Sequence, residues 1–244
     1  MRCFRADLHI HTCLSPCADL LMSPKRIVER AMVKKLDIIG ICDHNSAENI
    51  QAAKNAAAEK ITVLAGMEVT SSEEVHLLAL FDKIQDLLRL QNAVYAGLPT
   101  DENKEKVFGE QIICNEFDEV LGYNKRLLIS ATNLTLKEVI DEVHKLGGLT
   151  IASHVDREIY SVIGQLGFIP EDLNVDALEI SPNNSRDQAL KKFPEIKKFP
   201  LITSSDAHFL QDIGKATTSF LLEEPTIEEI RMAFKNEEGR MIII

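Results

Sequence analysis

The fold of this chain is decided near its start, where residues 5–12 read Arg-Ala-Asp-Leu-His-Ile-His-Thr. Successive side chains of a β-strand point to opposite faces, so Asp7, His9 and His11 are expected to share one face of this strand. Two imidazoles so close together on one rigid edge form half of a metal site. The alternative is a strand on which paired histidines alternate with apolar residues without binding anything.

The other histidines help to decide between these interpretations. Strand ends are where α/β barrels and open α/β sheets carry their chemistry. A core histidine needs only one partner, whereas here several distant apolar runs each end in a polar side chain that could bind a metal. The side chains that follow such runs, at residues 38–42, 61–67, 149–152 and 201–205, are His44, Glu68, His154, Asp206 and His208.

Apolar runs alternate with helical patterns along most of the chain, which predicts a mostly parallel sheet with right-handed crossovers. Six or seven such units favour a barrel. Ser23 followed by Pro24 predicts a helix start, and capping boxes are expected at Thr135 and Thr226. His144 lies inside the helix that follows Thr135 and is expected to be structural or solvated.

One segment, at about residues 98–133, interrupts the alternation. Two short runs within it, at residues 111–114 and 119–123, predict an inserted β-hairpin. The hairpin is expected to be either a surface decoration or a lid that closes on substrate.

Length and composition limit the class of protein. A chain of 244 residues with 45% hydrophobic content can form one α/β domain, expected to span residues 1–244. No apolar run approaches the about 18 to 20 residues of a membrane span, and the start lacks a signal-peptide pattern. Five cysteines, an odd number, fit free thiols in a reducing compartment. We therefore expect a cytoplasmic protein with no membrane partner.

The charge balance bears on the partners. The formal net charge is -11, from 27 basic and 38 acidic residues. Such a balance argues against a long nucleic acid gripped by a basic face. An acidic protein can still bind an anionic substrate when metal ions supply the positive charge.

Six short motifs follow one another along the chain. They are Asp-Leu-His-Ile-His-Thr at 7–12, Cys-Asp-His at 42–44, Gly-Met-Glu at 66–68, Val-His-Leu-Leu at 75–78, Ser-His at 153–154 and Ser-Asp-Ala-His at 205–208. In this order they resemble the motifs of the polymerase and histidinol phosphatase (PHP) family of metallophosphoesterases. The resemblance covers nearly the whole chain. It implies a distorted (β/α)7 TIM-like barrel with up to three metal ions at its C-terminal mouth, to which this chain adds the inserted hairpin.

The resemblance also implies three ligand sets. The first metal would be held by His9, His11, Glu68 and Asp206; the second by Glu68 as a bridge with His76 and His154; the third by His44, His208 and Asp19.

Some positions depart from the family pattern. The family often has Ser-Asp-Gly soon after His-Thr, whereas here the loop reads Ser-Pro-Cys-Ala-Asp at residues 15–19, so Asp19 is assigned across a two-residue insertion. His76 precedes an apolar run, and its spacing alone would make it a core histidine. We further expect Asp7 and Asp43 to be carboxylates that fix the tautomers of the imidazole ligands.

The ligand types predict the chemistry. Imidazole and carboxylate ligands without a thiolate suit Zn(II), Mn(II) or Fe(II). Two or three such ions lower the pKa of water toward neutrality and neutralise phosphoryl oxygens, which favours hydrolysis of a phosphate ester and requires no serine or cysteine nucleophile. The residues expected to be catalytic through these ions are His9, His11, Glu68, Asp206 and His208.

Further residues are needed for the substrate phosphate. Arg157 lies three residues after His154, where family members often carry a basic residue, and its planar guanidinium suits a phosphate. Arg186 and Asn183 are weaker candidates in a turn after a predicted strand. For both arginines the alternative is an ordinary surface salt bridge.

Three functions remain open at this point. The first is a phosphatase or phosphodiesterase for a small substrate, such as a nucleotide, a short oligonucleotide, or a sugar or amino-alcohol phosphate. The second is a nuclease or polymerase-associated proofreading module, against which the acidic balance and the lack of tryptophan weigh. The third is a non-catalytic metal-binding regulatory domain, although such a domain is expected to have lost ligands. Nothing in the sequence indicates the oligomeric state.

Overall fold

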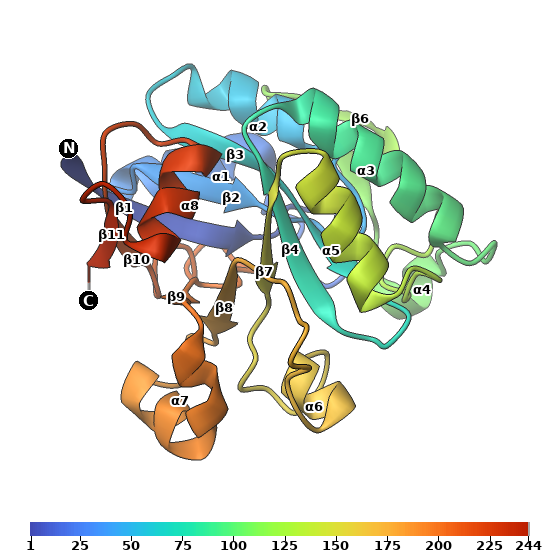
Figure 1. Ribbon diagram of the computed structural model, residues 1–244. Coiled ribbons are helices and arrows are strands. Elements are labelled where there is room, and N and C mark those ends of the chain that lie inside the picture. Colours follow the sequence, from blue (N-terminus) through green and yellow to red (C-terminus); the bar gives the residue numbers. More distant parts are fainter. Residues whose placement is uncertain (244) are drawn as a thin grey trace.

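The computed structural model describes residues 1–243 and places helices and strands in alternation (Figure 1). The strands are β1 (Arg2–Ile10), β2 (Ile38–Ile41), β3 (Thr62–Thr70), β4 (His76–Phe81), β5 (Ile112–Cys114), β6 (Val120–Tyr123), β7 (Leu149–Ala152), β8 (Ala177–Ile180), β9 (Leu201–Thr203), β10 (Thr218–Leu222) and β11 (Met241–Ile243). The α-helices are α1 (Pro24–Val33), α2 (Ile50–Ala57), α3 (Ile84–Gly97), α4 (Glu105–Phe108), α5 (Leu136–Lys145), α6 (Val162–Leu166), α7 (Arg186–Lys192) and α8 (Ile227–Lys235), and a 3-10 helix spans Pro194–Lys198.

Seven strands form the wall of a barrel, in the order β1-β2-β3-β4-β7-β8-β9. The ring closes at one end only, where Ile10 forms a parallel bridge with Ala207 in the segment after β9. Two further strands, β10 and β11, extend the sheet from the first half of β1, so β11 and the start of β1 lie on the same side of the molecule (Figure 1). The predicted distorted (β/α)7 barrel is confirmed.

Strand direction differs from the prediction of a mostly parallel sheet. Pairing is parallel between β1, β2 and β3 and between β7, β8 and β9, but β4 is antiparallel to both of its neighbours. The reason is the short connection of five residues between β3 and β4, since a parallel crossover needs about a dozen residues or more. The N-terminal end of β4 therefore lies where the other barrel strands have their C-terminal ends.

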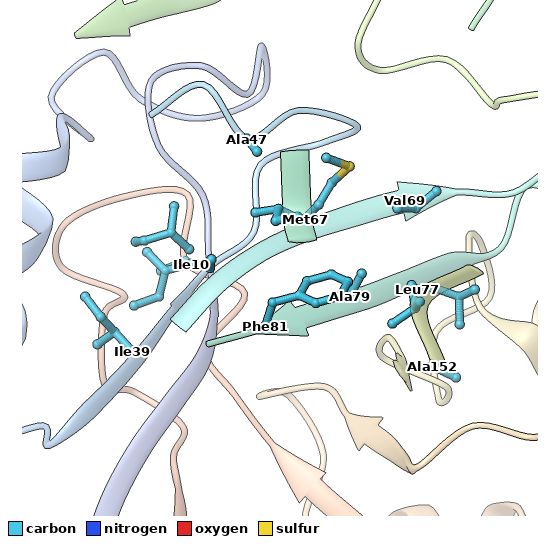
Figure 2. Packing of buried hydrophobic residues seen from close by; sticks show 14 of the residues in the cluster. Ile10, Ile39, Ala47, Met67, Val69, Leu77, Ala79, Phe81 and Ala152 are labelled. Carbon is cyan, nitrogen blue, oxygen red and sulfur yellow. The ribbon is translucent and has the colours of Figure 1, made fainter. Parts of the chain in front are cut away.

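Two apolar clusters lie on the two sides of the wall. The inner cluster takes residues from the seven barrel strands and from β10, and α8 covers it. The outer cluster packs the other face against α1, α2, α3 and α5, and Figure 2 shows part of it, including Ile10, Ile39 and Met67. Alternation along each strand thus supplies both layers.

The helix starts follow the predicted capping signals in two of three cases. Ser23 is the N-cap of α1 with Pro24 at the first position, and Thr135 forms a full capping box with Glu138 at the start of α5. The Thr135 side chain accepts from Glu138 N, and such a cap is worth about 1 kcal/mol, whereas Ser23 makes no side-chain cap hydrogen bond. The capping box predicted at Thr226 is only half formed, because Glu229 pairs with Arg240 instead.

The insertion contains the predicted hairpin, formed by β5 and β6, and also the short helix α4, which was not predicted. It is anchored to the loop after β1, where Ile112 N donates to Cys13 O and the Sγ atoms of Cys13 and Cys114 lie 3.7 Å apart. Asn49 stabilises this junction, because its Nδ2 donates a hydrogen bond to Ile112 O and its Oδ1 accepts one from Cys114 N. Within residues 1–243, no helix has the length and apolar character needed to cross a membrane.

Candidate metal centre

The inner face of the barrel changes from apolar to polar toward its partly closed end. On β3, Leu64 packs in the inner cluster, and Glu68, four residues later on the same face, lies among histidines. On β4, Leu78 packs in the same cluster, and His76, two residues earlier on the same face, lies at the mouth beside Glu68. Because every second residue faces inward, β3 and β4 each carry a candidate ligand on the same face as apolar residues of the inner cluster.

A β-bulge aims the histidines of β1 into this mouth. The register of β1 against β2 shifts between Asp7 and Ile10. Leu8 consequently packs in the inner cluster and Ile10 in the outer one, while His9 and His11 point toward the carboxylates of the centre. The prediction that these histidines share a face with Asp7 is wrong, because a bulge changes the alternation locally.

His76 reaches the centre because β4 runs against its neighbours. His76 at the start of β4 pairs with Thr70 at the end of β3. Its backbone N donates to Tyr160 O, and its Nδ1 lies 3.0 Å from Glu68 Oε1. A histidine at the start of a strand is therefore placed beside residues from strand ends.

Glu68 is the hub of the centre, with five imidazoles around one fully buried carboxylate. Each approaches within hydrogen-bond or ion-pair distance of a Glu68 oxygen, and together they come from four segments that follow or begin different strands. The nitrogen-to-oxygen distances are 3.4 Å for His9, 3.4 Å for His11, 3.2 Å for His44, 3.0 Å for His76 and 3.4 Å for His154.

Asp206 is a second buried carboxylate at the same mouth. Its Oδ1 lies 3.3 Å from His9 Nε2 and 3.2 Å from His11 Nε2. Both Asp206 and His154 have positive φ, +47° and +31°, in a left-handed backbone region that non-glycine residues rarely adopt. Such strained positions are concentrated at functional sites, where the surrounding structure holds them.

The gathered side chains form three groups whose candidate ligand atoms lie within 4.8 Å of one another. The groups are His9, His11 and Asp206; His44, Glu68 and His76; and His11, His44 and His208. Of the nine predicted ligands, eight lie at this mouth, because His154 also contacts Glu68. The grouping differs from the predicted sets in joining His44 with Glu68 and His76.

The donor set fits divalent metal ions. Five buried atoms of the centre have no hydrogen-bond partner within the described residues, although their positions face one another. They are His44 Nδ1, Glu68 Oε1, His76 Nδ1, His154 Nδ1 and Asp206 Oδ1. Buried polar atoms without a partner are costly, and imidazole nitrogens with carboxylate oxygens are the ligands of zinc, manganese and iron.

Burial and neighbouring charges shift the pKa values of the candidate ligands in different directions. Burial and the neighbouring His208 lower the pKa of His11 to about 4, so His11 is neutral at pH 7. Burial acts to raise the pKa of Glu68, but the surrounding histidines outweigh it and hold that pKa well below its usual range. For His9, burial acts to lower the pKa, yet Asp206, Glu179 and Glu68 raise it well above the usual range.

Glu179 is a functional residue that the sequence interpretation missed. It lies on β8 two residues after Ala177 of the inner cluster, is fully buried, and has Oε1 3.1 Å from His9 Nδ1. The sequence contained a signal for this role, because Glu179 lies within a short apolar run, and a buried glutamate needs a hydrogen-bonding or charged partner. Imidazole ligands of metals commonly donate their second N–H to such a carboxylate.

Asp7 and Asp43, predicted to fix imidazole tautomers, differ in their partners. Asp43 accepts hydrogen bonds from Thr12 and from Ser15 Oγ at 2.7 Å, and Ser15 Oγ in turn lies 3.0 Å from His11 Nδ1. Asp43 therefore acts on His11 only through Ser15. Asp7 accepts from backbone N–H groups of the segment after β9.

Asp19 lies apart from the three groups of ligand atoms. Its carboxylate accepts a hydrogen bond from Leu21 N at 2.8 Å, and its backbone N donates to His208 O. The His208 ring stacks on His11 with centroids 4.3 Å apart. The third ligand set thus has His208 in place beside the centre, and Asp19 as a ligand stays a prediction.

The predicted phosphate-binding residues separate into two places. Arg157 Nη2 lies 2.7 Å from Asp206 Oδ2 at the edge of the metal centre. Arg186 instead lines a cavity of about 490 Å³ between β9 and β10, together with Lys215, and the same cavity is lined by Asn184 next to Asn183. The structure therefore brings Arg157, but neither of the other two, into contact with the centre.

A barrel whose mouth gathers imidazoles around two buried carboxylates defines a class, the metal-dependent hydrolases. Comparison with protein families specifies it further. A family model described as PHP domain matches residues 7–167, and one described as PHP-associated matches residues 188–238. This chain belongs to the PHP domain family.

Several known proteins are similar to this chain. It is 29% identical over 199 residues to a protein of Haemophilus influenzae named 5'-3' exoribonuclease, covering 65% of this chain and 71% of that relative. It is 22% identical to the uncharacterized protein YqxK of Bacillus subtilis, covering 100% of this chain and 65% of the relative.

Among solved structures, the fold is similar to that of the lesion-specific endonuclease PfuEndoQ of Pyrococcus furiosus, with a TM-score of 0.75, 20% identity, and coverage of 100% of this chain and 58% of that one. A putative metal-dependent phosphoesterase of Bifidobacterium adolescentis is similar with a TM-score of 0.54, 19% identity, and coverage of 83% and 87%. At these identities the likeness concerns the fold. This chain spans little more than half of the endonuclease.

Proposed function

We propose that this chain hydrolyses a phosphate ester that is small enough to enter the barrel mouth, such as a nucleotide, a short oligonucleotide, or a sugar or amino-alcohol phosphate. The observation that carries the proposal is the Glu68 carboxylate among five imidazoles, with Asp206 beside it. These residues would hold two or three Zn, Mn or Fe ions, which would supply activated water and positive charge for the phosphoryl oxygens.

The residues of the chain divide the remaining work. The low pKa of Glu68 and that of Asp206, which the neighbouring His9 and His11 hold down against the effect of burial, keep both carboxylates ionised at neutral pH. Arg157 sits on the exposed side of Asp206, with its side chain 35% exposed, and can exchange that contact for a substrate phosphate. Its fork of donors would orient the phosphate toward the centre.

The test is release of inorganic phosphate by metal-loaded protein from a panel of phosphomonoesters and dinucleotides, with metal content measured on the same samples. Turnover that depends on added metal and is abolished in His9→Ala is expected, with Arg157→Ala raising KM about tenfold or more. Full metal loading without hydrolysis of any substrate in the panel would favour the non-catalytic regulatory domain.

A second candidate function is cleavage of nucleic acid. It is favoured by the names of two similar proteins, an exoribonuclease and an endonuclease, and by a third similar structure that is described as a complex with a 27-mer duplex. These names weigh against our expectation that no long nucleic acid is bound. The net charge of -11 weighs in favour of that expectation.

The two candidates differ in their substrate length and salt dependence. We expect mononucleotides and dinucleotides to be better substrates than a single strand of about 20 nucleotides that carries a 5′-phosphate. Their hydrolysis should change little when the salt concentration rises from about 50 to about 200 mM. Faster cleavage of the long strand, lost steeply with salt, would favour the nuclease.

We also propose a cytoplasmic location. All five cysteines are free, and Cys13 and Cys114 remain unlinked although their sulfur atoms are 3.7 Å apart. Free thiols in close pairs suit a reducing compartment.

A further inference from the structure

One aromatic ring at the mouth is not used by the proposed hydrolysis. Tyr160 stacks face to face on the imidazole of His76, with ring centroids 4.6 Å apart and an interplanar angle of 13°. The same His76 has Nδ1 3.0 Å from Glu68 Oε1. The His76 imidazole therefore lies between the Tyr160 ring and Glu68, the carboxylate at the middle of the candidate metal centre.

The backbone holds Tyr160 in this place. Its φ is +57°, a left-handed conformation that is unusual for a bulky residue, and its carbonyl accepts the His76 N–H at 2.9 Å. The carbonyl of His76 is bonded as well, since His76 O accepts from Ser153 N. The segment after β7 thus bonds to both backbone polar groups of His76 at the start of β4.

The same loop carries Arg157. Ser161, next to Tyr160, donates its hydroxyl to Arg157 O at 2.7 Å and caps α6 through Gly164 N. A Cβ atom at Gly164 would lie 2.3 Å from Glu158 O, so the first turn of α6 packs closely against the backbone of this loop. Arg157 and Tyr160 are consequently presented on one tightly held turn, the first against Asp206 and the second against His76.

The Tyr160 ring has one covered face and remains accessible. One face of the ring is occupied by the His76 imidazole, and 38% of the Tyr160 residue is exposed. A partly exposed aromatic residue on the same turn as Arg157 matches a ligand in which a phosphate and a flat aromatic group are joined by a short link. Aromatic side chains bind nucleobases in this way, because every base has a flat π-face.

We propose that Tyr160 is a specificity-determining residue, on which the base of a nucleotide substrate stacks while Arg157 and the metal centre hold its phosphate. This inference rests on the proposed phosphoesterase function and narrows it to nucleotides and other base-bearing phosphoesters. Sugar and amino-alcohol phosphates lack the flat group and gain nothing from the ring.

The test compares adenosine 5′-monophosphate with ribose 5-phosphate, which share the same ester and differ by the base. For the wild-type protein we expect kcat/KM to be about tenfold or more in favour of the nucleotide, the effect of one stacked base. Tyr160→Ala should lose about tenfold on the nucleotide, mainly through KM, and less than about twofold on ribose 5-phosphate. Tyr160→Phe, which keeps the ring, should stay within about twofold on both.

The matched control is Ile159→Ala, which removes an exposed apolar side chain from the neighbouring position of the same loop and should leave the ratio of the two substrates unchanged. Metal content is measured for each variant. An equal loss on both substrates in Tyr160→Ala, or a loss of bound metal, would mean that Tyr160 only positions His76 and would overturn the inference.

The proposed function and this inference can fail separately. If metal-loaded wild-type protein hydrolyses no substrate of the whole panel, the phosphoesterase proposal fails, and equilibrium binding of adenosine 5′-monophosphate and ribose 5-phosphate to that protein still tests the stacking. Tighter binding of the nucleotide that is lost in Tyr160→Ala supports the inference, whereas equal dissociation constants refute it.

Discussion

His9 Nδ1 lies 3.1 Å from Glu179 Oε1, and both side chains are fully buried. Because a carboxylate can only accept, this contact assigns the proton of the imidazole to Nδ1. His9 Nε2 is then directed at Glu68 and Asp206, where a metal ligand is needed. One buried carboxylate of β8 therefore sets the tautomer of a ligand from β1.

Replacing Glu179 by Gln should weaken metal binding while keeping the fold. The amide has nearly the same volume but can present an N–H to His9 Nδ1, which favours the wrong tautomer, so we expect about 10- to 100-fold lower metal affinity. Competition with a chelator measures this. Glu142→Gln, which changes a carboxylate that pairs with Lys145 on the surface of α5, is the control and should have no effect. Unchanged affinity in Glu179→Gln would show that the contact does not orient His9.

Metal binding should release a proton near pH 7. The pKa of His9 is raised in the metal-free protein, so His9 is protonated below that pKa and must lose its proton to become a ligand. The pKa of His11 is lowered to about 4, so His11 contributes no proton at pH 7. Affinity is therefore full above the His9 pKa and falls by up to about tenfold per pH unit below it. Calorimetric titrations in buffers of different ionisation enthalpy measure the released protons, and a value of zero would contradict the raised pKa of His9.

The third ligand set can be tested by two substitutions. His208→Ala removes a member of the group with His11 and His44 and should lower the metal stoichiometry by one if that group binds an ion. We expect Asp19→Asn to weaken occupancy of the same site, as the sequence predicts. The Asp19 carboxylate, however, already accepts from Leu21 N, and an unchanged stoichiometry by elemental analysis would remove it from the ligands.

Gly40 on β2 should not tolerate a side chain. A Cβ at this position would lie 2.4 Å from Leu8 O, a backbone atom of the neighbouring strand that cannot turn aside. We expect Gly40→Ala to lower the free energy of unfolding by about 3 kcal/mol. Gly122 on β6 provides the control, since a Cβ there meets nothing within 4 Å. Denaturant unfolding of both variants measures the difference, and equal stability would contradict the close approach of β1 and β2.

Much of the centre could be predicted from local patterns. Polar residues at the ends of apolar runs placed His44, His154 and Asp206 correctly at one mouth, because the C-terminal ends of parallel strands meet at one edge of a barrel. The capping box at Thr135 was also readable, since it depends on residues only three apart.

Other features depend on pairing between distant segments. The bulge in β1 is seen only in the register with β2, and it separates Asp7 from the faces of His9 and His11. Glu179 becomes a partner of His9 only when β8 and β1 lie in the same wall, 170 residues apart in sequence.

The sequence by itself determined the barrel, the family and which side chains are available as ligands, because alternation along a strand and the residues at its end are local properties. Only the tertiary structure decided how these side chains are grouped. It placed His76 at the mouth through the reversed direction of β4. It also paired His9 with Glu179 and stacked Tyr160 on His76. The physical reason is that strand direction, register and ring stacking are set by contacts between segments that no local spacing specifies.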